Sequence, residues 1–299
     1  MTATAPEELF ATLDVDRAPA DGPAAFGADL APATLLAAYR RGLFPLPAAD
    51  PYASAFNEAR SEAAVAAGRV PLLPGPDHGG DGGGPDGGPG GADPYALAWW
   101  SPDPRPLLAA DGVQLGRKLS RLLRNRLDWW TTADQAFEEV LAACAEGREP
   151  PWLTPELQEA LTGLHRLGAA HSAEVWQDGE LIGGVFGIAS GPVLSLDSMF
   201  HRRPDAARVA VADLAARFAA AGGRLLDAQW DSPHVRSLGA APQPRSRYLA
   251  ALAEDAGPLH PLDTSLLPAA RLAPERPRQP RPHGLPRDHR HPYRNARRP

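Results

Sequence analysis

Three strand-like segments in a row, within residues 171–200, constrain the fold of this chain more than any other feature. They read HSAEVW, LIGGVFGIAS and VLSLDSMF, and the pairs Asp178-Gly179 and Gly191-Pro192 separate them. Glycine-containing turns of this length join neighbouring antiparallel strands, so the run predicts a three-stranded meander. Helical patterns precede it, and a long helix over residues 205–221 and a further strand, LLDAQW, follow it. This order predicts an α+β domain with a mixed, largely antiparallel sheet.

Composition divides the chain into ordered and flexible parts. Residues 75–91 contain ten glycines and no aliphatic or aromatic side chain, so they cannot bury enough apolar surface to offset the entropy of ordering. The last residues alternate Arg with Pro, His and Gly, which is typical of a flexible basic tail. We expect four parts: a flexible N-terminus (1–19), a small N-terminal domain (20–108) with a disordered insertion at about 48–93, a main α+β domain (109–256) and a flexible Arg/Pro-rich tail (257–299).

The composition also narrows the class of protein. The single cysteine, Cys144, excludes an internal disulfide framework and fits a reducing compartment. No secretion signal opens the chain, and no apolar run approaches the ~20 residues that would span a membrane. We therefore expect a cytoplasmic protein with no membrane partner, and a monomer, because no heptad repeat or exposed apolar stripe is evident. The net charge of −6 argues against a generally basic nucleic-acid binder but allows a local basic patch.

Start and stop signals predict several helices. A short helix is expected in PATLLAAYRRGLFP, and another begins at Thr154 with Pro155 at its first position. Thr132 with Gln135 predicts a capping box that opens the helix AFEEVLAACAEG, directly after a strand over residues 128–131.

The segment VQLGRKLSRLLRNRL, residues 113–127, predicts a basic amphipathic helix. Arg117, Arg121 and Arg124 recur at i, i+4 and i+7 and share one face beside Lys118, while leucines supply the other side. We call these four residues the basic face. It is either an ordinary solvated helix surface or a contact for phosphates.

The strand LLDAQW carries an unusual pair of polar residues. Side chains alternate along a strand, so Asp227 and Gln229 are expected on one face. Burying either group without a partner costs several kcal/mol, roughly, and more for a charge. Either neighbours satisfy both groups, or this face lines a cavity where chemistry takes place.

Several motifs occur together in one order: YRRGLFP, WWSPDPR, AHSAEVWQDGELIGGVFGIASG followed by SMF, and LLDAQ followed by HVRSLGA. In this combination the chain resembles the leucyl/phenylalanyl-tRNA–protein transferases, over about residues 25–47 and 95–252. The resemblance implies a GNAT-like acyltransferase domain. It implies an aminoacyltransferase that moves Leu, Phe or Met from aminoacyl-tRNA to the N-terminal Arg or Lys of acceptor proteins, which marks them for N-end rule degradation. It implies no cofactor, because the tRNA ester is the activated donor.

The resemblance also implies roles for particular residues. Asp227 and Gln229 match the family's proposed catalytic pair, in which the Asp acts as a base, orients the amine or binds the acceptor's cationic end. Asp197 replaces a family glutamate thought to meet the basic end of the acceptor, and a structural turn or cap is the alternative. Six apolar residues match the family's pocket for the aminoacyl side chain, although core packing is the stronger interpretation for each one taken singly: Val185, Met199, Val211, Leu214, Phe218 and Leu226.

Two positions depart from the family pattern. Leu46 and Leu161 stand where the family has a tryptophan and a tyrosine, aromatic residues suited to stacking the terminal adenine of tRNA, although Trp152 remains. With a tRNA ligand implied, we expect the basic face to contact phosphates rather than solvent alone.

Other interpretations stay open. A GNAT-like transferase could use another aminoacyl-tRNA or acyl-CoA, although the loop HRRPDAA before the long helix has no glycine to grip a pyrophosphate. A non-catalytic tRNA-binding protein would also fit the two departures. The glycines of GGVFG lie inside a strand and predict close packing rather than a phosphate loop. Scattered histidines without HExxH predict no metal site, and His171 is expected to satisfy a hydrogen bond at a strand end.

Overall fold

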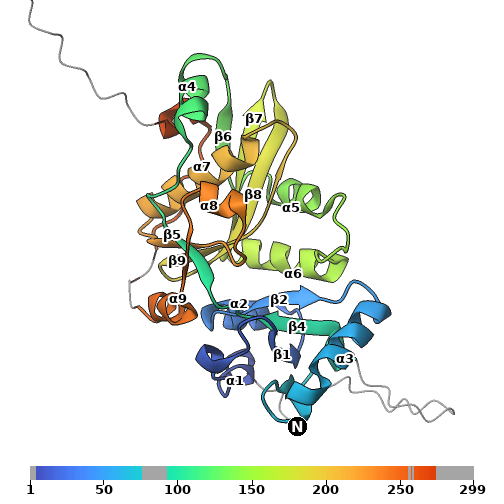
Figure 1. Cartoon of the computed structure of the whole chain (residues 1–299). Coiled ribbons are helices and arrows are strands. Elements are labelled where there is room, and N and C mark those ends of the chain that lie inside the picture. The colour runs from blue at the N-terminus through green and yellow to red at the C-terminus, as the bar shows by residue number, and fades with distance from the viewer. Residues whose placement is uncertain (1–4, 76–92, 255–256, 258, 274–299) are drawn as a thin grey trace, which may run out of the picture.

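The computed structural model describes residues 5–75, 93–254, 257 and 259–273. In these ranges the chain forms two sheets, one in a small N-terminal domain and one in a larger domain stacked against it (Figure 1). None of the helices in the described ranges is long and apolar enough to cross a membrane.

The small domain holds a four-stranded sheet in the order β2-β4-β1-β3, with β1 and β3 parallel and the other pairs antiparallel. Its elements are α1 (Pro6–Leu9), η1 (Val15–Arg17), β1 (Pro23–Gly27), α2 (Pro32–Arg40), β2 (Phe44–Pro47), α3 (Pro51–Ala66), β3 (Leu72–Leu73), η2 (Pro94–Ala96) and β4 (Leu97–Trp100).

The large domain holds an eight-stranded sheet in the order β11-β5-β10-β9-β8-β7-β6-β12, in which β9 and β10 are the parallel pair. Its strands are β5 (Arg105–Ala109), β6 (Trp130–Ala133), β7 (Ala170–Gln177), β8 (Glu180–Ser190), β9 (Val193–His201), β10 (Leu225–Asp227), β11 (Ala241–Gln243) and β12 (Leu267–Pro268). Its helices are α4 (Arg117–Asn125), α5 (Phe137–Ala145), α6 (Pro155–Arg166), α7 (Ala206–Ala220), α8 (Pro233–Ser237), α9 (Arg245–Leu252) and η3 (Ala269–Leu272).

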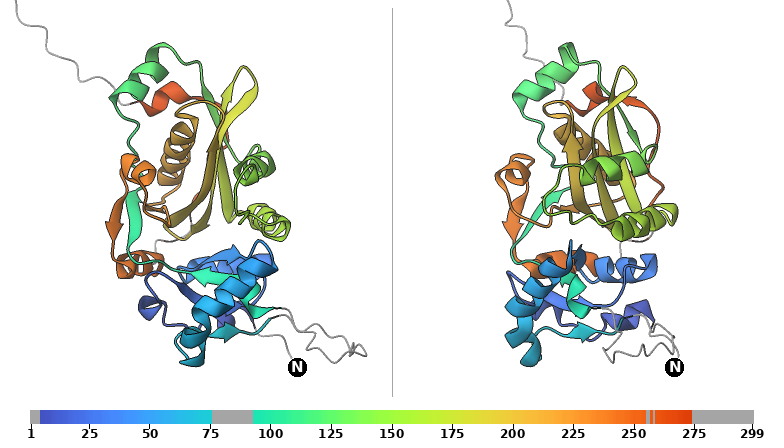
Figure 2. Two further views of the ribbon diagram at one scale, coloured as in Figure 1. Left: turned by 45° about the vertical axis from the view of Figure 1, so that its right-hand side comes forward. Right: turned by 90° about the vertical axis from the view of Figure 1, so that its right-hand side faces the viewer.

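Helices cover both faces of the large sheet. Helix α7 packs on one face against β7, β8 and β9, while α5 and α6 pack on the other (Figure 2). Helix α2 of the small domain lies against α6 and β8, so one apolar cluster runs from Leu35 and Trp99 of the small domain to Leu157 and Phe186 of the large one. Because the two domains share this core, side chains from both can meet at a fixed geometry along the junction.

The predicted α+β class with a mixed, largely antiparallel sheet is confirmed. The meander is β7, β8 and β9 with turns at the predicted pairs, and α7 then returns the chain to β10, which pairs parallel to β9. Thr154 caps α6 by accepting a hydrogen bond from the Leu157 N–H. The GGVFG glycines pack closely as expected, since a Cβ added at Gly187 would lie 1.9 Å from the Ser195 carbonyl oxygen.

The flexible segments predicted from composition were drawn too widely. In the predicted N-terminal segment 1–19, Phe10 is fully buried and meets Trp99 edge to face at 5.0 Å. In the predicted insertion 48–93, residues 51–66 form the helix α3, whose N-cap Asp50 accepts from the Ala53 N–H. Its alanines and single valine favour a helix. The prediction missed this helix because the glycine-rich residues that follow it dominate the composition of the predicted insertion. Residues 1–4 and 76–92 lie outside the described residues.

The predicted tail 257–299 is also ordered at its start, because residues 267–268 pair with β6 and residues 269–272 form η3. Residues 274–299 lie outside the described residues. The predicted boundary at residue 108 is wrong as well. It falls inside β5, which pairs with β10 and β11 of the large sheet.

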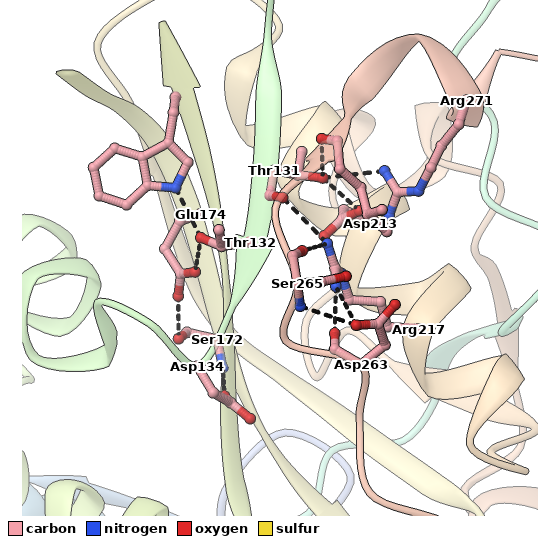
Figure 3. A network of polar contacts seen from close by, with 12 residues as sticks. Thr131, Thr132, Asp134, Ser172, Glu174, Asp213, Arg217, Asp263, Ser265 and Arg271 are labelled. Atoms are coloured by element: carbon pink, nitrogen blue, oxygen red, sulfur yellow. Dashed lines mark hydrogen bonds and ion pairs between the residues drawn. The ribbon is translucent and has the colours of Figure 1, made fainter. Parts of the chain in front are cut away.

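The predicted capping box at Thr132 is wrong. Thr132 lies inside β6, which begins at Trp130, two residues later than expected. Helix α5 begins after Ala136 and has no side-chain cap. The Thr132 hydroxyl instead donates to the buried Glu174 at 2.5 Å, and Ser172 donates to the other carboxylate oxygen at 2.5 Å (Figure 3). Burial raises the pKa of Glu174 above its usual value. A hydroxyl group contributes more stability by donating to a buried carboxyl than by capping a helix end.

Candidate functional site

The polar residues of LLDAQW meet at the place where the large sheet opens. Strands β9 and β10 pair from Leu225–Val193 to Asp227–Ser195, and in the described part of the chain β9 has no partner on this side beyond Ser195. Strand β10 ends at Asp227, whereas β9 continues to His201. The end of this pairing leaves room for polar side chains of both strands to meet at the junction of the two domains.

Asp227 is buried and fully paired. The Arg105 guanidinium, from the first residue of β5, donates through Nε to Asp227 Oδ1 at 3.1 Å and through Nη2 to Oδ2 at 2.5 Å. The same guanidinium lies over the Tyr248 ring, with its carbon 4.2 Å from the ring centroid. A two-point guanidinium–carboxylate pair of this kind is strong and fixes orientation.

Gln229 reaches the site by a turn rather than by strand alternation. The residue has a φ of 59°, in the left-handed region, so the strand that was predicted to reach Trp230 ends before it. Its N–H donates to Asp227 Oδ1 at 3.1 Å, and its side-chain Nε2 donates to Ser195 Oγ at 2.9 Å. The predicted proximity of Asp227 and Gln229 is confirmed, but the reason given for it is wrong. A left-handed non-glycine residue costs about 1–3 kcal/mol, which the two hydrogen bonds offset.

Asp197 lies on a bulge of β9. Phe186 pairs with Ser198 and Gly187 with Leu196, so Asp197 is the extra residue of β9 at this point, and a bulge changes where a side chain points. One carboxylate oxygen accepts from Ser195 Oγ at 2.7 Å, and the other accepts from the hydroxyl of Tyr39 on α2. The predicted cap role is not seen in these contacts, because the two hydrogen bonds come from hydroxyl groups and not from backbone N–H groups.

These contacts join into one chain of hydrogen bonds that crosses the domain junction. It runs from Tyr39 through Asp197, Ser195, Gln229 and Asp227 to Arg105, and we call these six residues the junction chain. Sequence reasoning missed Tyr39, Ser195 and Arg105 as members. Tyr39 and Arg105 stand inside motifs that carried the family resemblance, and Ser195 lies between two of them, two residues before Asp197 on the same strand.

The charge of the junction chain is unbalanced. It contains two carboxyl groups, Asp197 and Asp227, and one guanidinium, Arg105. Burial raises the pKa of the Asp197 carboxyl to about 7, and the nearby Asp227 charge acts in the same direction against the hydrogen bonds from Tyr39 and Ser195. Burial and the same carboxyl raise the pKa of Tyr39 well above its usual value. The site is therefore suited to a cationic ligand.

Aromatic side chains lie next to the junction chain. Trp230, directly after Gln229, is 41% exposed and meets Trp100 and Phe44 edge to face, with ring centroids 5.4 and 5.8 Å apart. Of the two leucines that depart from the family pattern, Leu161 is buried in the core and offers no stacking surface, whereas Leu46 is partly exposed on β2. Trp152 packs partly exposed against the same core cluster as Leu46.

The six predicted pocket residues belong to one apolar cluster on the α7 side of the sheet. Met199 is partly buried at the border of this cluster, and the other five are fully buried within it: Val185, Val211, Leu214, Phe218 and Leu226. The structure thus brings all six together. Whether they form a pocket wall as well as core stays a prediction.

The basic face lies far from the junction chain. Arg117, Lys118 and Arg121 are exposed on α4, and Arg124 is partly exposed. In every view α4 is at the end of the large domain away from the small domain (Figures 1 and 2). Among the described residues no group of three or more His, Cys, Asp or Glu side chains is placed to hold a metal ion. His171 makes a hydrogen bond at a strand end, as expected, because its Nδ1–H donates to Asp134 Oδ2 at 2.8 Å.

Comparison with known proteins identifies the family. Residues 107–253 match the family model described as leucyl/phenylalanyl-tRNA protein transferase. A leucyl/phenylalanyl-tRNA–protein transferase of Aromatoleum aromaticum is 39% identical over 236 residues, which cover 78% of this chain and 81% of that protein. One from Chromohalobacter salexigens is 39% identical over 253 residues, covering 84% and 80%. This chain belongs to the leucyl/phenylalanyl-tRNA–protein transferase family, and the predicted enzyme class, an aminoacyltransferase, is confirmed.

Among solved structures, a GCN5-related N-acetyltransferase from Kribbella flavida is similar at 14% identity and a TM-score of 0.31, covering 48% of this chain and 55% of that one. A likeness of this degree carries no further inference.

Proposed function

We propose that this protein transfers leucine, phenylalanine or methionine from aminoacyl-tRNA to the α-amino group of acceptor proteins that begin with Arg or Lys. The amine attacks the ester carbonyl, a peptide bond forms, and the terminal ribose hydroxyl of the tRNA leaves with the proton that the amine gives up. Because the ester is already activated, the protein has mainly to hold amine and ester together, which can be worth effective molarities of about 10⁵–10⁸ M. The modified acceptor then enters N-end rule degradation, and we place the enzyme in the cytoplasm as a monomer.

The unbalanced charge of the junction chain carries this proposal. In the described part of the chain the Asp197 carboxylate accepts from two hydroxyl groups and from no guanidinium or ammonium group. A buried carboxylate without a cation is costly, so a bound cation would stabilise it. The side chain of an N-terminal Arg or Lys brings that cation, and Asp197 is the residue that we assign to it.

Asp227 suits an orienting role better than that of a base. Both of its oxygens accept from Arg105, and Oδ1 also accepts from the Gln229 N–H, so little capacity is left to take a proton. We assign to Asp227 the task of fixing the Gln229 backbone turn, and to the Gln229 amide the task of holding the attacking amine. Together they act by positioning, which general-acid–base catalysis would supplement by about 10²–10⁴-fold if a base were present.

The donor is assigned to the surfaces around the junction chain. Exposed Trp230, with Trp100 beside it, presents aromatic surface next to Gln229, where the terminal adenine of tRNA can stack for about 1–3 kcal/mol. The aminoacyl side chain is assigned to the apolar cluster that Met199 borders. The basic face binds phosphates of the tRNA body.

One assay tests the proposed function. Purified protein is incubated with labelled Leu-tRNA, Phe-tRNA or acetyl-CoA and a peptide that begins with Arg, and a matched peptide that begins with Ala serves as control. We expect label on the Arg peptide from both aminoacyl-tRNAs, and none from acetyl-CoA. Transfer from acetyl-CoA, or equal transfer to the Ala peptide, would contradict the proposal, and tRNA binding without any transfer would favour a non-catalytic tRNA-binding protein.

A further inference from the structure

Tyr39 is the one member of the junction chain that comes from the small domain. It lies in the last turn of α2 and is 3% exposed. Its hydroxyl donates to Asp197 Oδ2, although the two residues are 158 positions apart in the chain. A phenol hydroxyl has one hydrogen, so Tyr39 uses its only donor on this carboxylate. Because α2 packs against α6 and β8 of the large domain, the domain junction sets where this hydroxyl lies.

A second buried hydroxyl holds the other oxygen of the same carboxylate. Ser195 is 3% exposed and donates to Asp197 Oδ1 at 2.7 Å. Its oxygen accepts from Gln229 Nε2 at 2.9 Å, so its single hydrogen is left for Asp197. Asp197 itself is half-buried. A ligand therefore has access to a residue whose two hydroxyl partners lie in the interior.

Each oxygen of the Asp197 carboxylate keeps room for a further donor. An ionised carboxylate has about four lone-pair sites, two on each oxygen. The two hydroxyl groups fill one site on each oxygen. The neighbouring Asp227 shows that one oxygen accepts two donors here, because its Oδ1 receives both Arg105 Nε and the Gln229 N–H at 3.1 Å. One remaining site on each Asp197 oxygen is the pattern that a two-pronged donor fits.

The two cations that an acceptor's first side chain can offer differ in how they match this pattern. A guanidinium is planar and presents its N–H groups as a fork, so it bonds both oxygens of one carboxylate at the same time. Arg105 binds Asp227 in this way, through Nε and Nη2. A lysine ammonium is a compact point charge that is more strongly hydrated and much less sensitive to the rotation of the carboxylate. Fixing the carboxylate in a half-buried place therefore favours guanidinium over ammonium.

We propose that Tyr39 is a positioning residue that determines specificity for the acceptor, so that the enzyme prefers an acceptor that begins with Arg to one that begins with Lys. Ser195 holds one oxygen of Asp197, and a single hydrogen bond restrains the rotation of a carboxylate less than two do. The Tyr39 hydroxyl supplies the second bond, and both oxygens then accept from a guanidinium fork. This inference rests on the proposed function, in which Asp197 binds the first side chain of the acceptor.

The ratio of kcat/KM for an Arg peptide to kcat/KM for a Lys peptide tests this proposal. The two peptides differ only in their first residue. Transfer is measured at pH 8, because burial raises the pKa of the Asp197 carboxyl to about 7 and the ionised form is needed. Phenylalanyl-adenosine is the donor, since it carries the ester and the adenine but no tRNA phosphates. We expect native protein to prefer the Arg peptide by about tenfold or more, because the fork adds one hydrogen bond between charged groups.

Tyr39→Phe removes the hydroxyl and keeps the ring. We expect the ratio to fall to about threefold or less, because kcat/KM falls for the Arg peptide and changes little for the Lys peptide. Loss of a purely structural contact would lower both values by the same factor and leave the ratio unchanged. Tyr95→Phe, the same chemical change elsewhere in the small domain, is the matched control and should keep the native ratio. A folded Tyr39→Phe protein with the native ratio overturns the proposal.

A measurement on native protein does not depend on the folding of any variant. A peptide that begins with asymmetric dimethylarginine keeps the positive charge and loses two of the five N–H donors, and one that begins with dimethyl-lysine controls for the added bulk. We expect dimethylation to lower kcat/KM about fivefold more for the Arg peptide than for the Lys peptide.

Two results separate this proposal from the proposed function. Equal use of the Arg and Lys peptides by native protein, or equal effects of the two dimethylations, overturns the proposal and leaves the proposed function valid. Absence of transfer to either peptide, from phenylalanyl-adenosine and from Phe-tRNA alike, refutes the proposed function and this proposal with it.

Discussion

The junction chain differs in charge balance from a second buried network, formed by Asp213, Arg217, Arg271 and Thr131. This second network fastens residues 259–273, the strap, to the large domain, and we call it the strap network. Each network contains a buried aspartate paired with an arginine. In the strap network one carboxylate, Asp213, accepts from both Arg217 and Arg271. Arg217 also donates to backbone carbonyls, and Arg271 also donates to Thr131 Oγ1.

The junction chain has two carboxyl groups and one guanidinium, and Arg105 pairs with Asp227. Asp197 accepts from two hydroxyl groups, and no guanidinium or ammonium group of the described residues pairs with it. A buried network built for stability satisfies its own charges, whereas one that lacks a cation is suited to receive it from a ligand.

The largest expected effect is the loss of transfer activity in the variant Asp227→Asn. The change leaves Arg105 without a buried counter-charge and loosens the Gln229 turn, so we expect transfer from Phe-tRNA to fall by about 10²-fold or more, together with a lower Tm. The double variant Arg105→Met, Asp227→Leu removes both charges and is the control for folding. It should recover Tm and not activity, as measured by thermal melts and single-turnover rates. Recovery of activity along with Tm would show that the pair is structural.

The strap network should respond in stability alone. Asp213→Asn leaves two guanidinium groups without their buried counter-ion, which costs about 3–5 kcal/mol. We expect a large fall in the free energy of unfolding by urea titration, with the rate of transfer from phenylalanyl-adenosine per folded molecule unchanged. A tenfold loss of that rate at full folding would mean that the two networks are not separable.

The same Asp-to-Asn substitution at Asp197 should change the free energy of unfolding in the opposite direction. Burial raises the pKa of this carboxyl to about 7, so the folded state holds the proton more tightly than the unfolded state, and wild-type stability falls as pH rises from about 4 to 7. An uncharged Asn has no such cost. We therefore expect Asp197→Asn to stabilise the protein relative to wild type at pH 8, and less so at pH 5. Urea titrations at both pH values check this, and a destabilised variant at pH 8 would show that Asp197 already has a cationic partner.

How far the sequence predicts these networks depends on how local their causes are. Asp227 and Gln229 stand two residues apart, so their proximity follows from the sequence even though a left-handed turn, not strand alternation, produces it. Arg105 lies 122 residues from Asp227, and the contact depends on β5 pairing beside β10. No periodicity in the sequence specifies that pairing. The meander and its turns were predictable because short-range turn chemistry fixes them.

The strap shows the limit of composition as a guide. Residues 259–273 contain two prolines and several polar residues, which predict flexibility when considered alone. They are ordered because distant Asp213 and Arg217 offer charges and donors that a local pattern does not show. In the same way Thr132 was expected to cap a helix, and a carboxyl on the neighbouring strand takes its hydroxyl instead.

The smallest effect is expected from a deletion that touches neither network. Removal of residues 76–92, with Gly75 joined to Asp93 through a short Gly-Ser linker, shortens the connection between these two residues. The entropy of closing a loop depends only logarithmically on its length. We expect Tm, KM and kcat to stay close to those of the native protein. A loss of transfer of more than about tenfold would mean that these residues take part in binding a substrate.

The central claim, that Asp197 binds the cationic side chain of the acceptor's first residue, is tested most directly by a double-substitution cycle. The KM of native protein and Asp197→Asn is measured for peptides that begin with Arg and with citrulline, which has the same shape and no charge. A hydrogen bond to a charged group contributes about 1.5–3 kcal/mol, so we expect the Asn change to raise KM for the Arg peptide by about 10- to 100-fold. For the citrulline peptide it should change KM by less than about threefold. Equal effects on the two peptides would contradict the claim, because Asp197 would then act without regard to the charge of the acceptor.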